Sequence, residues 1–165
     1  MKLEIPRPLL EIMEKLEAAG YETVAVGGCV RDCLLGKQPH DWDMATAATL
    51  EEMKQVLSGY RLLETGLRHG TLTVLHGGEQ VEITAFRRET GYADGRHPDS
   101  VEYTRSLRED LARRDFTINA MAWSSKTGLV DCFGGQEDLK NRVIRCVGDP
   151  ERRFSEDALR IARAM

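Results

Sequence analysis

Hydrophobic spacing in one part of the chain and helix-start patterns in two others predict helices. Between residues 8 and 20 hydrophobic residues return every three or four positions, which predicts an amphipathic helix that ends at a glycine. The segment 49–52, Thr-Leu-Glu-Glu, has the pattern of a helix start, with threonine as the capping residue and acidic residues in the first turn. The segment 106–109, Ser-Leu-Arg-Glu, is a capping box, and we expect its helix to continue to Met121.

Short apolar runs with the composition of β-strands lie between these helical segments. They span residues 24–26, 41–45, 60–63, 71–75, 81–86, 129–132 and 143–147. Gly27-Gly28 separates the first run from a brief helix over Cys29–Leu35, and a second glycine pair at 77–78 joins two strands into a hairpin. The order of elements predicts an α/β fold of the α+β type, with a mixed sheet of about five strands backed by helices.

Composition and charge narrow the class of protein. With 165 residues, 41% of them apolar and 30% charged, the chain suits one globular domain with a real core. No apolar run is long enough to span a bilayer and the first residues lack a signal peptide, so we expect no membrane association and a cytoplasmic location. The four cysteines have neither zinc-site nor disulfide-scaffold spacing, which favours buried free thiols. The net charge is −4, but the acidic excess lies within residues 1–60, and the later cations are mostly arginines that suit phosphate contacts.

Acidic side chains alternate with apolar ones in two of the predicted strands. In Asp41-Trp42-Asp43, alternation sends both carboxylates to one face of the strand. Like charges this close repel unless a cation lies between them, and hard oxygen ligands suit Mg²⁺. Glu82 lies on a second alternating strand and supplies a third carboxylate if the two strands are neighbours. Such a set is typical of two-metal phosphoryl transfer.

Gly27-Gly28 lies between a strand and a helix, a few residues before the paired aspartates. Glycines at this place let backbone N–H groups approach a phosphate, and Arg31 lies one turn into the helix, where it can pair with that anion. Each feature alone has an ordinary explanation: solvated surface acids for the aspartates and plain helix packing for the glycines. His40-Asp41 also suggests a metal phosphohydrolase, but the other histidines fall on predicted strands or loops, where they do not form its helical ligand set.

Four motifs occur in an order that resembles a known family. They are Gly27–Asp32 with Asp41-Trp42-Asp43, Arg113–Ala120, Asp131–Leu139, and Glu156–Arg160 with Arg163. Together they resemble the signatures of nucleotidyltransferases that add CCA to tRNA or poly(A) to RNA, over about residues 20–165. The resemblance implies a class II nucleotidyltransferase head that acts on the 3′ end of tRNA with CTP, ATP and Mg²⁺, without a predicted protein partner.

The resemblance also implies roles for individual residues. Catalysis would rest on Asp41, Asp43 and Glu82, and the first two would bind the metal. Nucleotide contacts would come from Gly28, Arg31, Arg114, Asp115, Asn119, Asp157, Arg160 and Arg163.

We expect a last helix to begin at Ser155-Glu156-Asp157. Asp157 and Arg160 are spaced i and i+3 on it, so their side chains can meet one base edge. Cytosine and adenine both offer an amino donor beside a ring-nitrogen acceptor, which a carboxylate and a guanidinium match. Uracil and guanine present the opposite order and would leave polar groups unpaired. An ordinary helix salt bridge is the alternative explanation of the pair.

Two segments favour the CCA-adding form over poly(A) polymerase. Gly66–Thr73 resembles the CCA-adding enzymes, and 92–102 resembles their flexible loop, except that His97 replaces a basic residue beside Arg96. We expect a catalytic head over residues 1–148 and the start of a helical neck over 149–165. The last helix is cut without a cap, which suggests a longer natural protein. A poly(A) polymerase and a non-catalytic nucleotide- or RNA-binding fragment remain the alternatives.

Overall fold

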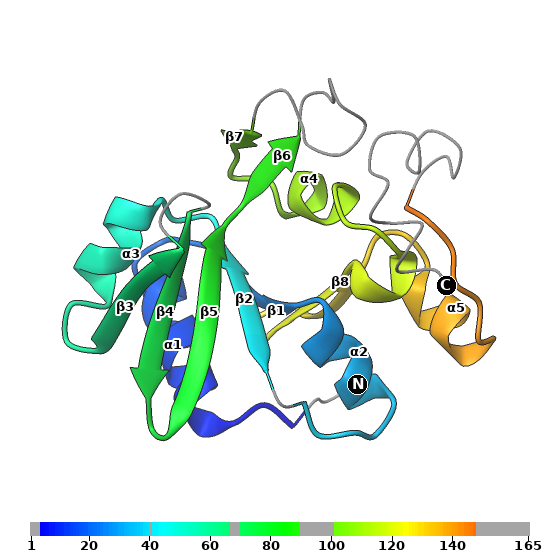
Figure 1. Cartoon of the computed structure of the whole chain (residues 1–165), viewed down its shortest axis with the longest axis horizontal. Coiled ribbons are helices and arrows are strands. Elements are labelled where there is room, and N and C mark those ends of the chain that lie inside the picture. The colour runs from blue at the N-terminus through cyan, green and yellow to red at the C-terminus, as the bar shows by residue number, and fades with distance from the viewer. Residues whose placement is uncertain (1–3, 40, 67–69, 90–100, 148–165) are drawn as a thin grey trace.

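The computed structural model describes residues 4–39, 41–66, 70–89 and 101–147, whose arrangement Figure 1 shows. The helices are α1 (Arg7–Ala18), α2 (Gly28–Leu34), α3 (Leu50–Val56), α4 (Leu107–Ala112), α5 (Gly135–Lys140) and the 3₁₀ helix η2 (Thr117–Asn119). The strands are β1 (Thr23–Val26), β2 (Trp42–Thr46), β3 (Arg61–Gly66), β4 (Thr71–His76), β5 (Glu79–Ala85), β6 (Arg87–Glu89), β7 (Val101–Tyr103), β8 (Met121–Ser124) and β9 (Gly128–Asp131). Across these residues, no helix has the length and apolar character needed to cross a membrane.

The main sheet of the described chain has seven strands in the order β3-β4-β5-β2-β1-β8-β9. Only β2 and β5 run parallel, and every other neighbouring pair in this sheet is antiparallel. The expected mixed α/β sheet is therefore confirmed, although it is wider than the five strands expected. Strands β6 and β7 form a separate two-stranded sheet, which Figure 1 places above the end of β5.

Two hydrophobic cores lie on opposite faces of the main sheet. On one face, α1 and α3 contact β5 and β4, and Figure 1 shows α1 passing behind these strands. The alternation of β1 directs Ala25 to this first core and Val24 and Val26 to the second, which α4 covers through Leu107 and Leu111. Both faces of β1 are thus buried, which explains why its four residues show no polar alternation.

Local signals place the helix starts where the sequence predicts them. The Thr49 hydroxyl accepts a hydrogen bond from the backbone N–H of Glu52 (3.2 Å), whose carboxylate accepts one from the N–H of Thr49 (2.8 Å). This reciprocal capping box satisfies two backbone donors at the start of α3. At α4, the Ser106 hydroxyl caps the N–H of Glu109 in the same way (3.3 Å).

Three expectations from the sequence are wrong. The helix that begins after Ser106 ends at Ala112 and does not reach Met121, because residues 121–124 form β8 between β1 and β9. Residues 143–147 do not form a strand, since only Cys146 makes a bridge, to Phe116. The sequence predicts no helix between the strands expected at 129–132 and 143–147, yet residues 135–140 form the helix α5.

Candidate active site

Asp43 and Glu82 lie side by side on two neighbouring strands of the main sheet. Strand β2 begins at Trp42, and alternation places Trp42 and Met44 in the first core while Asp43 points to the opposite face. Because β2 and β5 are parallel neighbours, Asp43 lies directly opposite Glu82 in the strand register. Asp41 lies immediately before the strand, and all three residues are exposed.

Electrostatic repulsion acts on this group of carboxylates. The pKa of Asp43 is raised from its ordinary value of 3.8, first because neighbouring protein removes water from its carboxylate and second because of the charge of Glu82. Asp41 acts in the same direction more weakly, whereas Arg114 lowers the pKa. Carboxylates that repel each other in this way form a donor set that a hard cation would stabilise.

This donor set fits a Mg²⁺ ion that is also bound by phosphates and water, but not one held by protein side chains alone. Among the described residues, no group of three or more His, Cys, Asp or Glu side chains is arranged to hold a metal ion by itself. Magnesium commonly binds through one or two carboxylates together with substrate phosphates and water, instead of a full cage of protein ligands. Asp43 with Asp41 or Glu82 therefore suits a metal that arrives with a nucleotide, and does not suit a permanently bound structural ion.

The glycine turn leads from β1 into α2 beside these carboxylates. Gly27 has a φ angle of +82°, in the left-handed region that glycine adopts without strain. A Cβ atom at Gly28 would come within 3.3 Å of the Arg31 guanidinium, so the absence of a side chain lets Arg31 fold back over the turn. Helix α2 also packs against β2, where the Cys29 thiol donates to the backbone carbonyl of Asp43 (3.7 Å).

Arg31 joins the first motif to the second. Its Nη1 donates a hydrogen bond to the Asn119 side-chain oxygen (2.8 Å), and its Nε donates to Asp32 (3.1 Å). Asn119 in turn donates through Nδ2 to Asp115 (3.3 Å), and the same Asp115 oxygen accepts from the backbone N–H of Phe116 (2.7 Å). The structure thus brings together three of the predicted nucleotide-binding side chains, from segments 88 residues apart.

Arg114 approaches the same turn from the other side. A Cβ atom at Gly27 would lie 3.6 Å from its Nη1, and its charge acts on Asp43. Burial lowers the pKa of the Arg114 guanidinium, and the charges of Asp110 and Asp43 oppose that effect. Asp110, which the sequence analysis did not single out, is fully buried and accepts a hydrogen bond from Arg114 Nη2 (3.1 Å). Its i, i+4 spacing from Arg114 is the signal that could have found it.

The remaining predicted site residues lie outside the described part of the chain. Asp157, Arg160 and Arg163 fall within 148–165, and most of the predicted flexible loop falls within 90–100. Gly66–Thr73 is described except for residues 67–69.

All four cysteines are free, as the spacing predicts. Cys29 and Cys146 are buried, whereas Cys33 and Cys132 are partly exposed. Burial raises the pKa of the Cys29 thiol to about 11, so this group stays protonated and unreactive at neutral pH. The thiol beside the candidate site is therefore part of the packing and not a nucleophile.

Comparison with known proteins identifies the family. The profile of the Poly A polymerase head domain matches residues 23–145. This range includes Asp43 and Glu82, the glycine turn, and the hydrogen bonds that link Arg31, Asn119 and Asp115. The chain therefore belongs to the poly(A) polymerase head-domain family. Within this family it belongs with the nucleotidyltransferases of the class II CCA-adding type.

Relatives in sequence and structure point in the same direction. CCA-adding enzymes from Lactobacillus helveticus and Ligilactobacillus salivarius are each 54% identical to it over 156 residues, or 94% of this chain. The structure of the Bacillus stearothermophilus CCA-adding enzyme in complex with CTP superposes with a TM-score of 0.85 at 42% identity, covering 96% of this chain and 37% of that one. A Thermotoga maritima CCA-adding enzyme complexed with tRNA gives a TM-score of 0.71 at 30% identity, with 93% and 35% covered. The chain spans 39% and 38% of the two curated relatives.

Proposed function

We propose that this chain is the catalytic head of a tRNA nucleotidyltransferase that adds CMP and AMP, from CTP and ATP, to the 3′ end of tRNA. The observation that carries the proposal is the register of Asp43 opposite Glu82, beside a glycine turn that is flanked by Arg31 and Arg114. The similarity to a CCA-adding enzyme whose structure contains CTP supports the same substrate class.

The chemistry follows from the charges at this site. The 3′-hydroxyl of tRNA would attack the α-phosphate of the nucleotide in line, and pyrophosphate would leave with the electrons of the broken P–O bond. Asp41 and Asp43 would hold Mg²⁺, which would supply neutralising charge for the triphosphate. Glu82 would support that site or attract the hydroxyl proton, because it lies opposite Asp43 on the neighbouring strand.

The nucleotide would be held by groups on both sides of the turn. Gly28 and Arg31 would contact its phosphates, because no side chain at Gly28 obstructs the approach. Asn119 and Asp115, linked to Arg31 by hydrogen bonds, would contact the ribose and triphosphate, and Arg114 would contact the nucleotide from the other side.

Base selection is proposed for the segment that follows residue 147. There Asp157 and Arg160 would match the shared hydrogen-bond pattern of cytosine and adenine, and Arg163 would assist. We further propose a catalytic head over residues 1–148, the start of a helical neck over 149–165, and a cytoplasmic location. The partners would be the tRNA 3′ end and the two nucleotides.

The direct test is nucleotide addition to tRNA that lacks its 3′ CCA, by the protein with its downstream chain restored. We expect three residues to be added, in the order C, C, A, and Asp41→Ala to slow addition by at least about a hundredfold through loss of a metal ligand. Activity of Asp41→Ala equal to that of the parent would contradict the metal assignment.

The length of the product separates the alternatives. The matched family carries the name of poly(A) polymerase, which favours polyadenylation as the second candidate. A long run of A residues without use of CTP would establish that alternative. Nucleotide binding without any addition would instead establish a non-catalytic nucleotide-binding protein.

A further inference from the structure

Asp110 is a fully buried carboxylate with three donors around it. It lies on α4, and none of its side chain is exposed to solvent. Its Oδ1 accepts hydrogen bonds from the backbone N–H of Arg87 (3.1 Å) and from Nε of Arg113 (3.4 Å). Its Oδ2 accepts from Nη2 of Arg114 (3.1 Å). Both oxygens are therefore in use, and the donors come from two separate parts of the chain.

Two of the three donors, Arg87 and Arg114, connect Asp110 to both sides of the candidate site. Arg87 begins β6, two residues after the end of β5, the strand that carries Glu82. Arg114 approaches Gly27 at the glycine turn, and its charge acts on Asp43. A single buried carboxylate thus fixes the backbone just beyond the β5 strand and the cation that lies beside Asp43.

The exposure of the pair is unequal. Asp110 is fully buried, whereas 19% of the Arg114 side chain remains exposed. The carboxylate therefore acts from the interior, and part of the arginine side chain still reaches the surface at the turn.

We propose that Asp110 is a positioning residue for nucleotide binding: it holds the Arg114 guanidinium against Gly27, so that a triphosphate meets a cation already oriented. The inference rests on the proposed function and deepens it, because it assigns a role to a residue outside the four motifs. A buried ion pair that served packing alone would stabilise the fold without any effect on nucleotide affinity in the folded protein.

The test is a double-mutant cycle with CTP and Mg²⁺ as the probe, measured by calorimetry on this chain. The variants are Asp110→Asn, Arg114→Gln and the two combined. We expect Asp110→Asn to weaken CTP binding about tenfold, because the charge-assisted bond that orients Arg114 is lost. In the Arg114→Gln background, Asp110→Asn should have almost no further effect, since the residue through which it acts is absent.

Glu109→Gln is the matched control. It removes a carboxylate from the same helix, at an exposed ion pair with Arg88, and should leave CTP affinity within about twofold of the parent. An Asp110→Asn affinity equal to that of the parent would overturn the proposal. So would an equal loss with and without Arg114, because the effect would then not pass through the arginine.

Asp110→Asn removes the buried negative charge that pairs with Arg113 and Arg114, and should therefore lower stability. If it does not fold, Asp110→Glu takes its place in the cycle, because it keeps the charge but moves the carboxylate by one methylene. Its CTP affinity should also fall in an Arg114-dependent way, and parent-like affinity would overturn the proposal.

A second measurement needs no nucleotide. Rotation of the Arg114 guanidinium about its Nε–Cζ bond, followed by NMR on ¹⁵N-arginine-labelled chain, should be slow in the parent and faster in the Asp110 variant. Equal rotation rates would exclude orientation by Asp110. If the parent chain showed slow rotation but did not bind CTP, Asp110 would still restrain Arg114. The nucleotide-binding role would then be wrong, together with the proposed function.

Discussion

At the scale of single residues, the surroundings of Asp43 disfavour the ionised form of its carboxyl group. Partial loss of water to neighbouring protein and the charge of Glu82 raise the pKa of Asp43, so the folded chain holds a proton at this carboxyl more tightly than the unfolded chain does. At a pH above this raised pKa, ionisation of Asp43 therefore acts against folding. The charge of Asp43 therefore does not stabilise the fold, which supports the proposal that it binds a metal ion.

Asp43→Asn should for this reason raise the unfolding temperature at pH 7 slightly. The neutral amide relieves both the desolvation and the repulsion from Glu82, and this gain exceeds the lost attraction to Arg114 because the net pKa shift is upward. Thermal denaturation followed by circular dichroism measures the change. The control is Glu102→Gln, an exposed residue paired with Arg88, which should leave the temperature almost unchanged. A clear fall for Asp43→Asn would show that the carboxylate stabilises the fold.

Individual residues differ in how far the sequence could reveal them. Alternation along the strand predicts the face on which Asp43 lies, but only strand pairing brings Glu82 opposite to it. The hydrogen bond between Arg31 and Asn119 joins positions 88 residues apart, and no local rule indicates it. Asp110 escapes notice because an i, i+4 acid–base pair on a short helix usually lies on the surface.

At the scale of elements, α5 packs so closely against η2 that one position requires glycine. A Cβ atom at Gly135 would lie 2.1 Å from the backbone carbonyl oxygen of Thr117, which is part of η2 beside Asn119. The position does not require an unusual φ angle, so the constraint is one of space alone. The family motif that contains Gly135 therefore also supports the segment that carries Asn119.

Gly135→Ala should destabilise the chain by about 2–3 kcal/mol, because backbone must move to admit the methyl group. Urea denaturation measures the difference. Gly59→Ala is the matched control, since nothing lies within 4 Å of a Cβ atom there and its φ is not positive. If both variants lost the same stability, the close packing of α5 against η2 would be wrong.

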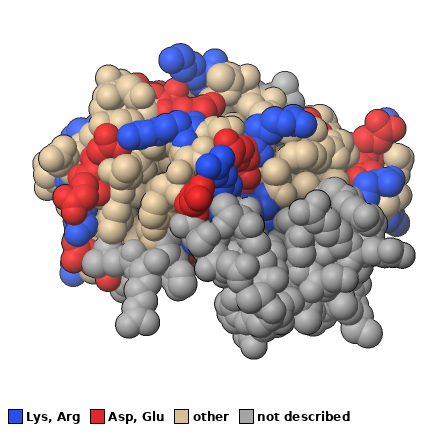
Figure 2. Space-filling view, turned by 90° about the horizontal axis from the view of Figure 1, so that it is seen from above, with Lys and Arg blue, Asp and Glu red and all other residues tan. Residues whose placement is uncertain are grey.

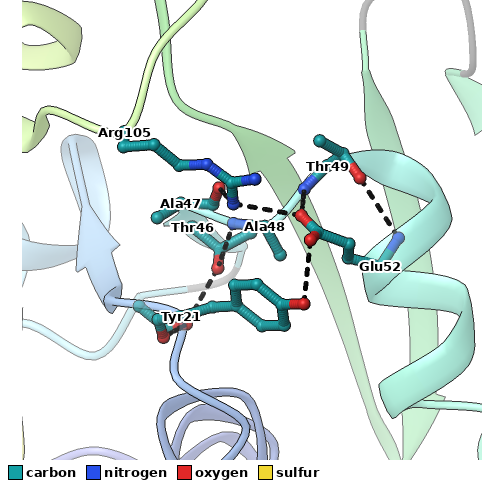
Figure 3. A network of polar contacts seen from close by, with 8 residues as sticks. Tyr21, Thr46, Ala47, Ala48, Thr49, Glu52 and Arg105 are labelled. Carbon is teal, nitrogen blue, oxygen red and sulfur yellow. Dashed lines mark hydrogen bonds and ion pairs between the residues drawn. The ribbon is translucent and has the colours of Figure 1, made fainter.

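A polar network joins three connecting segments at the start of α3, as Figure 3 shows. The Glu52 carboxylate accepts hydrogen bonds from the Thr49 N–H (2.8 Å), from Tyr21 (2.8 Å) and from Arg105 (3.0 Å). Arg105 also donates to the backbone carbonyl of Ala47. The segment that follows β7 is thereby attached to α3 and to the residue after β2, and Tyr21 ties the segment before β1 to α3.

This network has a pH dependence with a definite sign. The pKa of Glu52 is lowered from 4.5 to about 2, first by the Thr49 backbone and then by Arg105 and Tyr21. Its stabilising contribution is therefore complete above about pH 4.5 and is lost as the pH falls toward 2. In urea denaturation across this range, the parent should lose more stability than Glu52→Gln. Parallel curves for the two proteins would contradict the assignment.

The elements that the sequence predicted correctly carry local signals. The caps of α3 and α4 and the glycine turn between β4 and β5 depend on neighbouring residues alone. The segment after Ala112 was predicted as helix because its apolar residues fit either period, and burial on both faces between β1 and β9 makes it the strand β8. Residues 143–147 are apolar enough for a strand, yet Val143 and Ile144 are exposed and have no strand partner among the described residues.

At the scale of the whole molecule, charge is balanced locally on the described surface. Figure 2 shows acidic and basic residues interspersed on the side seen from above. In the described chain, Arg88 pairs with Glu102 and Glu109, and Arg105 pairs with Glu52. With a net charge of −4, the chain does not attract anions by its overall field. The proposed recognition of a nucleotide would therefore depend on the local arrangement of Arg31, Arg114 and a metal ion.

The most direct measurement is calorimetric titration of the chain with CTP, in Mg²⁺ and in EDTA, for the parent and for Asp43→Asn. We expect the parent to bind CTP only with Mg²⁺. The CTP affinity of Asp43→Asn should be at least about tenfold lower, because the metal loses a ligand, although the fold of this variant is no less stable. CTP binding that is unaffected by both the removal of Mg²⁺ and the loss of Asp43 would contradict a metal-dependent nucleotide site at this corner of the sheet.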